Sequence, residues 1–173
     1  MIQTRVSLSV SALLLTLACS PAKPAADTAV AAPASPTTDP AADKAAVAKA
    51  HDVLEGSYRT SDCNAMVGVA ADDAVFEPPN TPSAKGPDAI RKWCDPMFAQ
   101  MKTKSLTISN KEIDTSGDIG VDTGDYDWIL TPAKGGADVH AVGRYVTIWH
   151  RQSDGSWKTT RLIWNSSEAP KKS

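Results

Sequence analysis

The strongest constraint on the fold is a series of four strand-like segments in the C-terminal part of the chain. The segments are residues 104–114, 119–130, 139–151 and 157–166, and glycine-containing turns separate them. The last turn, Asp154-Gly155, is the strongest hairpin signal in the chain, because glycine readily adopts positive φ. Four strands joined by hairpins predict an antiparallel sheet.

Helical patterns precede these strands. Asp43 can cap a helix that reaches about Arg59, and its apolar stripe comprises Ala46, Val47, Ala50, Val53, Leu54, Gly56 and Tyr58. A short helix follows Asp62, and residues 74–79 resemble a brief strand stopped by two prolines. A third helix opens at Pro87 and extends to Met101, with Pro96 expected to kink it or end its regular part. Helices followed by hairpin-linked strands predict an α+β domain with the helices on one face of the sheet.

The N-terminal residues are typical of an export signal. Arg5 is followed by an apolar run over residues 6–17, which is shorter than the roughly 20 residues of a transmembrane helix. The following residues, Leu15-Thr16-Leu17-Ala18-Cys19, resemble the lipobox of bacterial lipoproteins. We therefore expect a signal peptide over residues 1–18 and lipidation of Cys19, with an ordinary secretory signal as the alternative. Because Ser20 and not Asp follows the cysteine, we expect the periplasmic face of the outer membrane as the destination.

Residues 19–44 form a second compositional segment. Alanine and proline dominate it and aromatic residues are absent, so it cannot bury enough surface to fold and is expected to be a tether. The domain is predicted over residues 45–168, followed by a tail over residues 169–173. The formal net charge of −2 provides no basic field for nucleic acid.

Several short phrases, taken in order, resemble one superfamily. They are Ala71-Asp72-Asp73-Ala74-Val75-Phe76, Gly86 with Ala89-Ile90-Arg91, Ser116-Gly117-Asp118-Ile119-Gly120-Val121, Gly143-Arg144-Tyr145-Val146 with Trp149, and Asp154-Gly155-Ser156-Trp157-Lys158. Over residues 44–168 the chain is similar to the SnoaL-like and ketosteroid-isomerase-like group of the nuclear transport factor 2-like superfamily. The resemblance implies a cone: a curved antiparallel sheet wrapped around three N-terminal helices, with a pocket at its open end.

The same resemblance argues against ketosteroid isomerase activity. The general-base position of those enzymes corresponds here to Pro78, and the position of their oxyanion tyrosine corresponds to Leu54, one turn from Tyr58. Their second oxyanion donor falls near Gly143 or Arg144, where no carboxyl exists. The resemblance therefore implies this fold without the ketosteroid isomerase catalytic set.

Two residues are candidates for acid–base chemistry. Asp122 shares a strand face with Tyr126, Trp128 and Leu130, so it enters the cavity if that face is concave, where it could act as a base or bind a cation. A solvated strand is the alternative. His140 lies on the next strand beside Arg144 and is the histidine to test, whereas His51 is expected on the outer side of the first helix. The histidine spacing matches no metal motif, and we expect neither a metal nor a cofactor.

Five tryptophans suggest an aromatic cavity, with core packing as the alternative for each. The candidate ligand-binding residues are Tyr58, Phe76, Trp93, Tyr126, Trp128, Arg144 and Trp164. Trp157 is assigned to the structure or to a dimer face. The leading hypothesis is a membrane-anchored domain that binds a small hydrophobic or aromatic ligand. The alternatives are a lyase or isomerase acting on a small hydrophobic carbonyl compound, and a module that forms homodimers through the convex face of the sheet.

Cys63 and Cys94 remain once Cys19 is lipidated. An even number of thiols in an oxidising compartment favours a disulfide between the second and third helices. Two separate cysteines packed as small apolar residues are the alternative.

Overall fold

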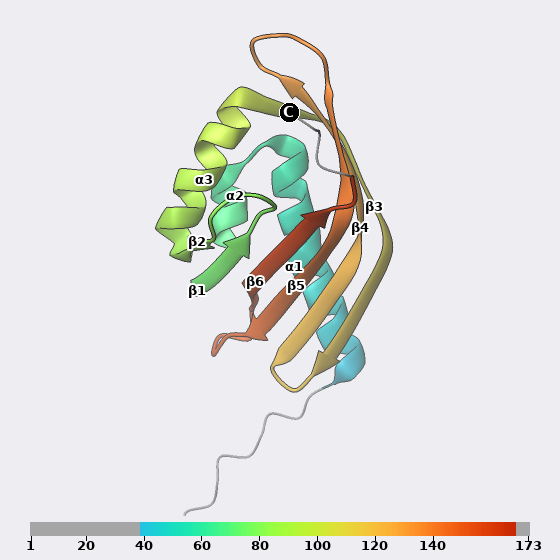
Figure 1. Cartoon of the computed structure of the whole chain (residues 1–173). Helices are drawn as coiled ribbons and strands as arrows, with labels where there is room; N and C mark the ends of the chain where they lie inside the picture. The colour runs from blue at the N-terminus through green and yellow to red at the C-terminus, as the bar shows by residue number, and fades with distance from the viewer. Residues whose placement is uncertain (1–38, 169–173) are drawn as a thin grey trace, which may run out of the picture. The chain divides into compact units, whose positions relative to one another are not determined.

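A computed structural model describes residues 39–168, which contain three helices and six strands (Figure 1). In chain order they are α1 (Pro40–Thr60), α2 (Cys63–Gly68), β1 (Ala70–Glu77), β2 (Ala84–Lys85), α3 (Gly86–Gln100), β3 (Met101–Ser116), β4 (Ile119–Pro132), β5 (Val139–Arg151) and β6 (Trp157–Ser166). The predicted signal peptide, Cys19, most of the predicted tether and the tail lie outside the described residues. Within residues 39–168, no helix is long and apolar enough to cross a membrane.

The six strands form one sheet in the order β2-β1-β6-β5-β4-β3. The four long strands are joined by hairpins as predicted, and they curve around α1 with the other helices on the same side (Figure 1). The sheet is not purely antiparallel, since β1 pairs with β6 in parallel. A hairpin cannot join these two strands, because parallel strands need a crossover connection, and here the elements from β2 to β5 lie between them in the chain.

Helix α1 begins earlier than predicted, because Asp39 and not Asp43 caps it. The Asp39 side chain accepts hydrogen bonds from the backbone N–H groups of Ala41 and Ala42, at 3.0 and 3.3 Å, and Pro40 fits the first helical position. Asp43 is instead buried and pairs with Arg151 Nη2 at 2.5 Å. This ion pair fastens the first turn of α1 to the end of β5.

Helix α3 continues through Pro96 to Gln100, so proline does not end it. Both Pro96 and Lys92 are exposed, and the Lys92 carbonyl that loses its helical partner can bond to water. The predicted last helical residue, Met101, starts β3 instead. Asp62 caps α2 as predicted, accepting from the N–H groups of Asn64 and Ala65.

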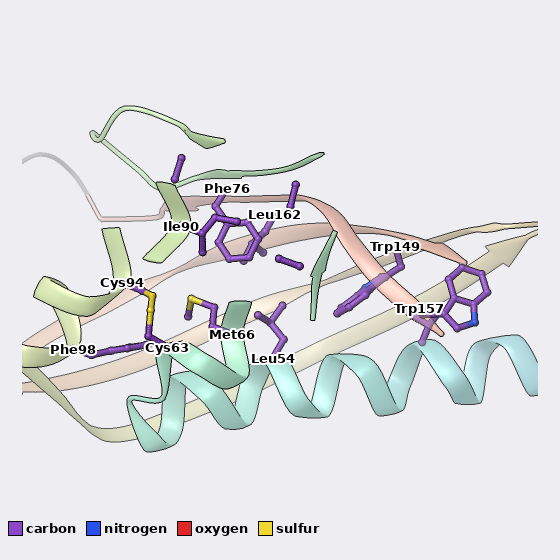
Figure 2. Packing of buried hydrophobic residues seen from close by; sticks show 14 residues of the cluster. Leu54, Cys63, Met66, Phe76, Ile90, Cys94, Phe98, Trp149, Trp157 and Leu162 are labelled. Carbon is purple, nitrogen blue, oxygen red and sulfur yellow. A yellow bond between two sulfur atoms is a disulfide. The ribbon is translucent and has the colours of Figure 1, made fainter. Parts of the chain in front are cut away.

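The core lies between the helices and the concave face of the sheet. Phe76, Ile90 and Leu162 pack together near the middle of the cluster, and Trp149 and Trp157 extend it along α1 (Figure 2). Trp157 is therefore structural and does not belong to a dimer face. The Arg151 guanidinium covers its ring, 4.7 Å from the ring centre.

Candidate functional site

A cavity lies between α1 and the concave face of the sheet. Its lining is almost entirely apolar and consists of His51, Leu54, Glu55, Tyr58, Leu106, Ile108, Tyr126, Trp128, Tyr145, Thr147, Leu162 and Trp164. Its volume, counted as the space open to the centre of a water-sized sphere, is about 70 Å³. This is room for a small organic molecule or a few waters.

Two glycines allow tyrosine rings to lie flat against the cavity side of the sheet. Gly124 is opposite Tyr145 on the neighbouring strand, and Gly143 is opposite Tyr126. A Cβ added to Gly124 would approach Tyr145 Cε1 to 2.8 Å, and one added to Gly143 would approach Tyr126 Cε1 to 2.7 Å. The missing side chains therefore provide the space that the two rings occupy.

The polar ends of three lining rings are bonded within the protein. The Tyr126 hydroxyl donates to the Asn165 carbonyl at 3.1 Å, and Trp128 Nε1 donates to Thr103 Oγ1 at 2.9 Å. The Tyr145 hydroxyl donates to Asp122 Oδ1 at 3.1 Å. These bonds fix the rings and leave mainly their carbon surfaces for a guest.

Asp122 and His51 form a buried pair at the cavity wall. Asp122 is 0% exposed and His51 is 4% exposed. Asp122 Oδ2 contacts His51 Nδ1 without hydrogen-bond alignment, and the imidazole stacks on Tyr145 with ring centres 5.6 Å apart. A buried carboxylate needs a partner to offset its lost hydration, and His51 and Tyr145 supply it.

The second ring nitrogen of His51 lacks a well-aligned partner. His51 Nε2 lies 3.4 Å from Glu55 Oε2, but Glu55 also accepts a 3.0 Å hydrogen bond from Arg59 Nε, which is on the exposed side. Within residues 39–168, neither His51 Nε2 nor Thr147 Oγ1 has a hydrogen-bond partner. Because buried polar atoms are normally bonded, two unpartnered polar atoms in side chains that line a cavity are unusual.

Burial also raises the pKa of two tyrosine hydroxyls that line the cavity. Desolvation raises the pKa of Tyr58, and nearby Tyr126 raises it further. Desolvation raises the pKa of Tyr145 as well, with additional contributions from the charge of Asp122 and the hydrogen bond to it. Both phenols therefore remain protonated over the whole neutral range and can act only as neutral hydrogen-bond groups.

Four of the predicted ligand-binding residues line the cavity: Tyr58, Tyr126, Trp128 and Trp164. Their placement agrees with the predicted faces of the first helix and of the sheet. Asp122 is also on the concave face, so the solvated alternative is wrong. Whether these residues bind a ligand stays a prediction.

The structure places the other three candidates elsewhere. Phe76 is fully buried in the core, and Trp93 packs against Trp164 at 5.5 Å between ring centres without lining the cavity. Arg144 points away, because Gly143 and Tyr145 on either side of it face inward. It is exposed and lies 3.4 Å from Asp125 Oδ1.

The predicted base His140 is also outside the cavity. It is exposed on the outer side of the sheet and bonds to Asp127 at 2.9 Å. The histidine in the cavity is His51, which was wrongly predicted to lie outside. The signal for it is the spacing of His51, Leu54, Glu55 and Tyr58, which occupy one helix face at i, i+3, i+4 and i+7. Val53, predicted to face inward, is 45% exposed.

Cys63 and Cys94 are joined by a disulfide that links α2 to α3, with Cα atoms 5.9 Å apart. The structure thus favours pairing over separate cysteines. With Asp95 these sulfurs are the one cluster of possible metal ligands within residues 39–168, but the sulfurs are already bonded to each other.

The convex face of the sheet carries exposed apolar side chains. Val121, Val146 and Ile163 on three adjacent strands are each about two-fifths exposed, and Val146 and Ile163 are register partners. The face lies on the opposite side of the sheet from the cavity.

Comparison with known proteins agrees with this architecture. The sequence model of the SnoaL-like domain matches residues 40–160. A ketosteroid isomerase-like protein from Erwinia carotovora atroseptica has a similar structure (TM-score 0.66, 20% identity, 73% of this chain and 98% of that chain). So does a nuclear transport factor 2-like superfamily protein from Salmonella enterica (TM-score 0.67, 13% identity, 75% and 94%). At these identities the likeness establishes the fold alone. No curated protein matches the chain.

Proposed function

The chain belongs to the family of SnoaL-like domains, and on this premise we propose that its cavity binds a small, mostly apolar molecule with at least one polar group. The fold accommodates ligand binding as well as lyase or isomerase chemistry, so the choice depends on the site. The observation that carries the proposal is the aromatic cavity with two unpartnered polar atoms, His51 Nε2 and Thr147 Oγ1. Apolar walls supply affinity, and a few polar atoms orient the guest.

Tryptophan fluorescence tests this proposal directly, since Trp128 and Trp164 line the cavity. The full chain is titrated with cyclohexanone and with phenol, and we expect a saturable change. Ile108→Phe fills part of the cavity and should weaken the response. Ile119→Phe, at an exposed position on β4, is the matched control. A linear response, or equal responses from the two variants, would contradict binding in the cavity.

A lyase or isomerase acting on a small hydrophobic carbonyl compound is the second candidate function. The observation that favours it is the burial of Asp122 against His51 at the wall of the cavity. Titratable groups placed together in a cleft are candidates for a functional site.

We also propose that Cys19 anchors the domain to the periplasmic face of a bacterial membrane. The support is the lipobox-like sequence and the short apolar run before it. Cells expressing the protein are labelled with radioactive palmitate and fractionated. We expect label in the wild-type chain and release of Cys19→Ser from the membrane fraction. An unlabelled wild-type chain would contradict the anchor.

Homodimer formation through the convex face is supported by the exposed Val121, Val146 and Ile163 side chains. Sedimentation equilibrium should give a dimer that Val146→Lys dissociates. A wild-type monomer at high protein concentration would exclude this arrangement.

A further inference from the structure

A cluster of possible metal ligands lies away from the cavity, where α2 meets α3. Cys63 is the first residue of α2, and Cys94 and Asp95 are consecutive residues of α3. One ligand atom from each of the three lies within 4.8 Å of the other two. Zinc bonds of roughly 2.0–2.3 Å place the ligands of one ion at most about 4.6 Å apart, so the three atoms are already near the required spacing.

The cluster opens onto a second, polar hollow. Its lining consists of Ser61, Asp62, Cys63, Asn64, Arg91, Asp95, Phe98, Ala99 and Lys102, none of which lines the cavity. Its volume, counted in the same way as that of the cavity, is about 350 Å³. Cys94 is 0% exposed and lies on the core side of the disulfide (Figure 2). Water and ions therefore reach the cluster from the side of Cys63 and Asp95.

Reduction of the disulfide makes metal ligands of its two sulfurs. In the oxidised protein they are bonded to each other and carry no charge, whereas the thiolate is the form that binds metals. The thiolate of a dithiol reductant attacks one sulfur, the S–S bond breaks, and the reductant leaves as its own disulfide after giving two protons to the cysteines. A divalent metal ion then displaces both thiol protons to water and binds the two thiolates.

The two helices are also held together without the disulfide. Arg91 Nη1 on α3 donates a hydrogen bond to Asn64 Oδ1 on α2 at 2.8 Å. Met66 of α2 and Ile90 of α3 are both fully buried in the same core cluster. We therefore expect the three ligands to remain close to one another after reduction.

We propose that the reduced protein binds a zinc ion through Cys63, Cys94 and Asp95, with water from the hollow in the fourth position. Two thiolates, a carboxylate and a water complete the tetrahedral set that zinc prefers, and thiolates disfavour magnesium and calcium. Three anionic ligands around a divalent ion leave one negative charge, which Arg91 and Lys102 at the hollow offset. Disulfide and metal are then alternative links between α2 and α3, selected by the redox state. The site does not depend on the ligand of the cavity.

Cobalt titration tests this site, because Co²⁺ replaces zinc and absorbs light. The full chain carrying Cys19→Ser keeps only the two cysteines of the cluster. It is reduced with a phosphine, freed of reductant in the absence of oxygen, and titrated with Co²⁺. We expect a near-ultraviolet charge-transfer band from thiolate to cobalt that saturates at one ion per chain and disappears when Zn²⁺ is added. The oxidised protein should give no such band.

Two carboxylate variants test the third ligand. Asp95→Asn should weaken cobalt binding by at least about tenfold, since the loss of even an outer partner of a metal ligand typically costs roughly 10- to 100-fold in affinity. Asp62→Asn is the matched control, because it removes the same charge from the same hollow and asparagine caps a helix as well as aspartate does. This control should bind cobalt as the parent chain does.

Thermal melts give a second readout. Zinc should raise the melting temperature of the reduced parent chain, because an ion that binds the folded form stabilises it, and should leave that of the oxidised chain unchanged. Circular dichroism establishes that the reduced chain and the variants fold.

Four results would overturn the proposal. A reduced chain without the charge-transfer band has no thiolate site, and an equal band in the oxidised chain places the metal elsewhere. Equal affinities in Asp95→Asn and Asp62→Asn remove Asp95 from the site and end the three-ligand arrangement. A reduced chain that is unfolded and that zinc does not refold shows that the cluster exists only in the oxidised protein.

Discussion

Replacing Asp122 by valine should lower the free energy of unfolding, because it leaves the polar groups of His51 and Tyr145 buried without their partner. The substitution removes the acceptor of the Tyr145 hydroxyl and the carboxylate that contacts His51 Nδ1. Losing one partner of a buried pair typically destabilises a protein by about 3–5 kcal/mol. That is a large part of the roughly 5–15 kcal/mol by which most domains are stable.

The informative comparison is between this single variant and a triple variant. Adding His51→Leu and Tyr145→Phe removes the two polar groups that the first substitution leaves without partners. Each such group costs about 1–3 kcal/mol, so the triple variant should recover at least about 2 kcal/mol relative to Asp122→Val. Any change in packing volume at position 122 is common to both proteins and cancels.

Guanidinium chloride unfolding of the oxidised protein, followed by tryptophan fluorescence, measures both differences. In thermal melts a recovery of 2 kcal/mol corresponds to roughly 8 °C for a domain of this size. An Asp122→Val variant within about 1 kcal/mol of wild type would contradict the expected loss, because the carboxylate would then have no buried partners to lose. A triple variant less stable than the single variant would also contradict it, because His51 and Tyr145 would then stabilise the fold even without Asp122.

Three further predictions concern the surroundings of the site. Gly124→Ala should lower stability by about 1–3 kcal/mol because its Cβ meets the Tyr145 ring, whereas Gly56→Ala, with open space around it, should raise stability by about 0.5–1 kcal/mol; equal melting temperatures would contradict the contact. The pKa values of all three tyrosines are raised, so the folded state holds these protons more tightly, and the stability they contribute is complete below about pH 10 and lost as pH rises further. Absorbance at 295 nm, which reports ionised tyrosine, should therefore rise only when the protein unfolds in alkali. A rise at lower pH, while the protein is still folded, would contradict the burial. Replacing Cys63 and Cys94 together by serine should lower the free energy of unfolding by about 3–4 kcal/mol in denaturant titrations, and a reductant should lower the midpoint of the wild type but not that of this variant; a wild-type midpoint that does not respond to reductant would contradict the disulfide.

Local signals were sufficient for much of the fold. The bounds of β5 and β6 follow the predicted segments because strong turn residues flank both, and the Asp62 cap needed only its own side chain. The parallel pairing of β1 with β6 was not predictable in the same way. Its partners are distant in sequence, and neither strand carries a local mark of the other.

The site residues also differ in whether a local sequence pattern predicts them. Period-two alternation was enough to place Asp122, Tyr126 and Trp128 on one face of β4. The sequence did not predict His51 in the cavity, because a histidine is ordinarily solvated. Its helical spacing with Leu54 and Tyr58 was the one signal for this position. The burial of His51 depends on the Asp122 carboxylate, and β1, β2 and β3 lie between these two residues in the sequence. Only folding brings them together.

The parallel contact between β1 and β6 also sets the order in which the chain can be completed. Before β6 has been synthesised, β1 can pair only with the two-residue β2. Its partners on β6, Thr159 opposite Ala70 and Leu162 opposite Phe76, come later in the chain. One of these β6 partners, Leu162, lies at the centre of the core, so the core against which the helices pack is incomplete until β6 is present. Folding of this domain therefore cannot be completed before β6 has been synthesised, and an intermediate lacking β6 would leave the Phe76 side chain without Leu162 beside it.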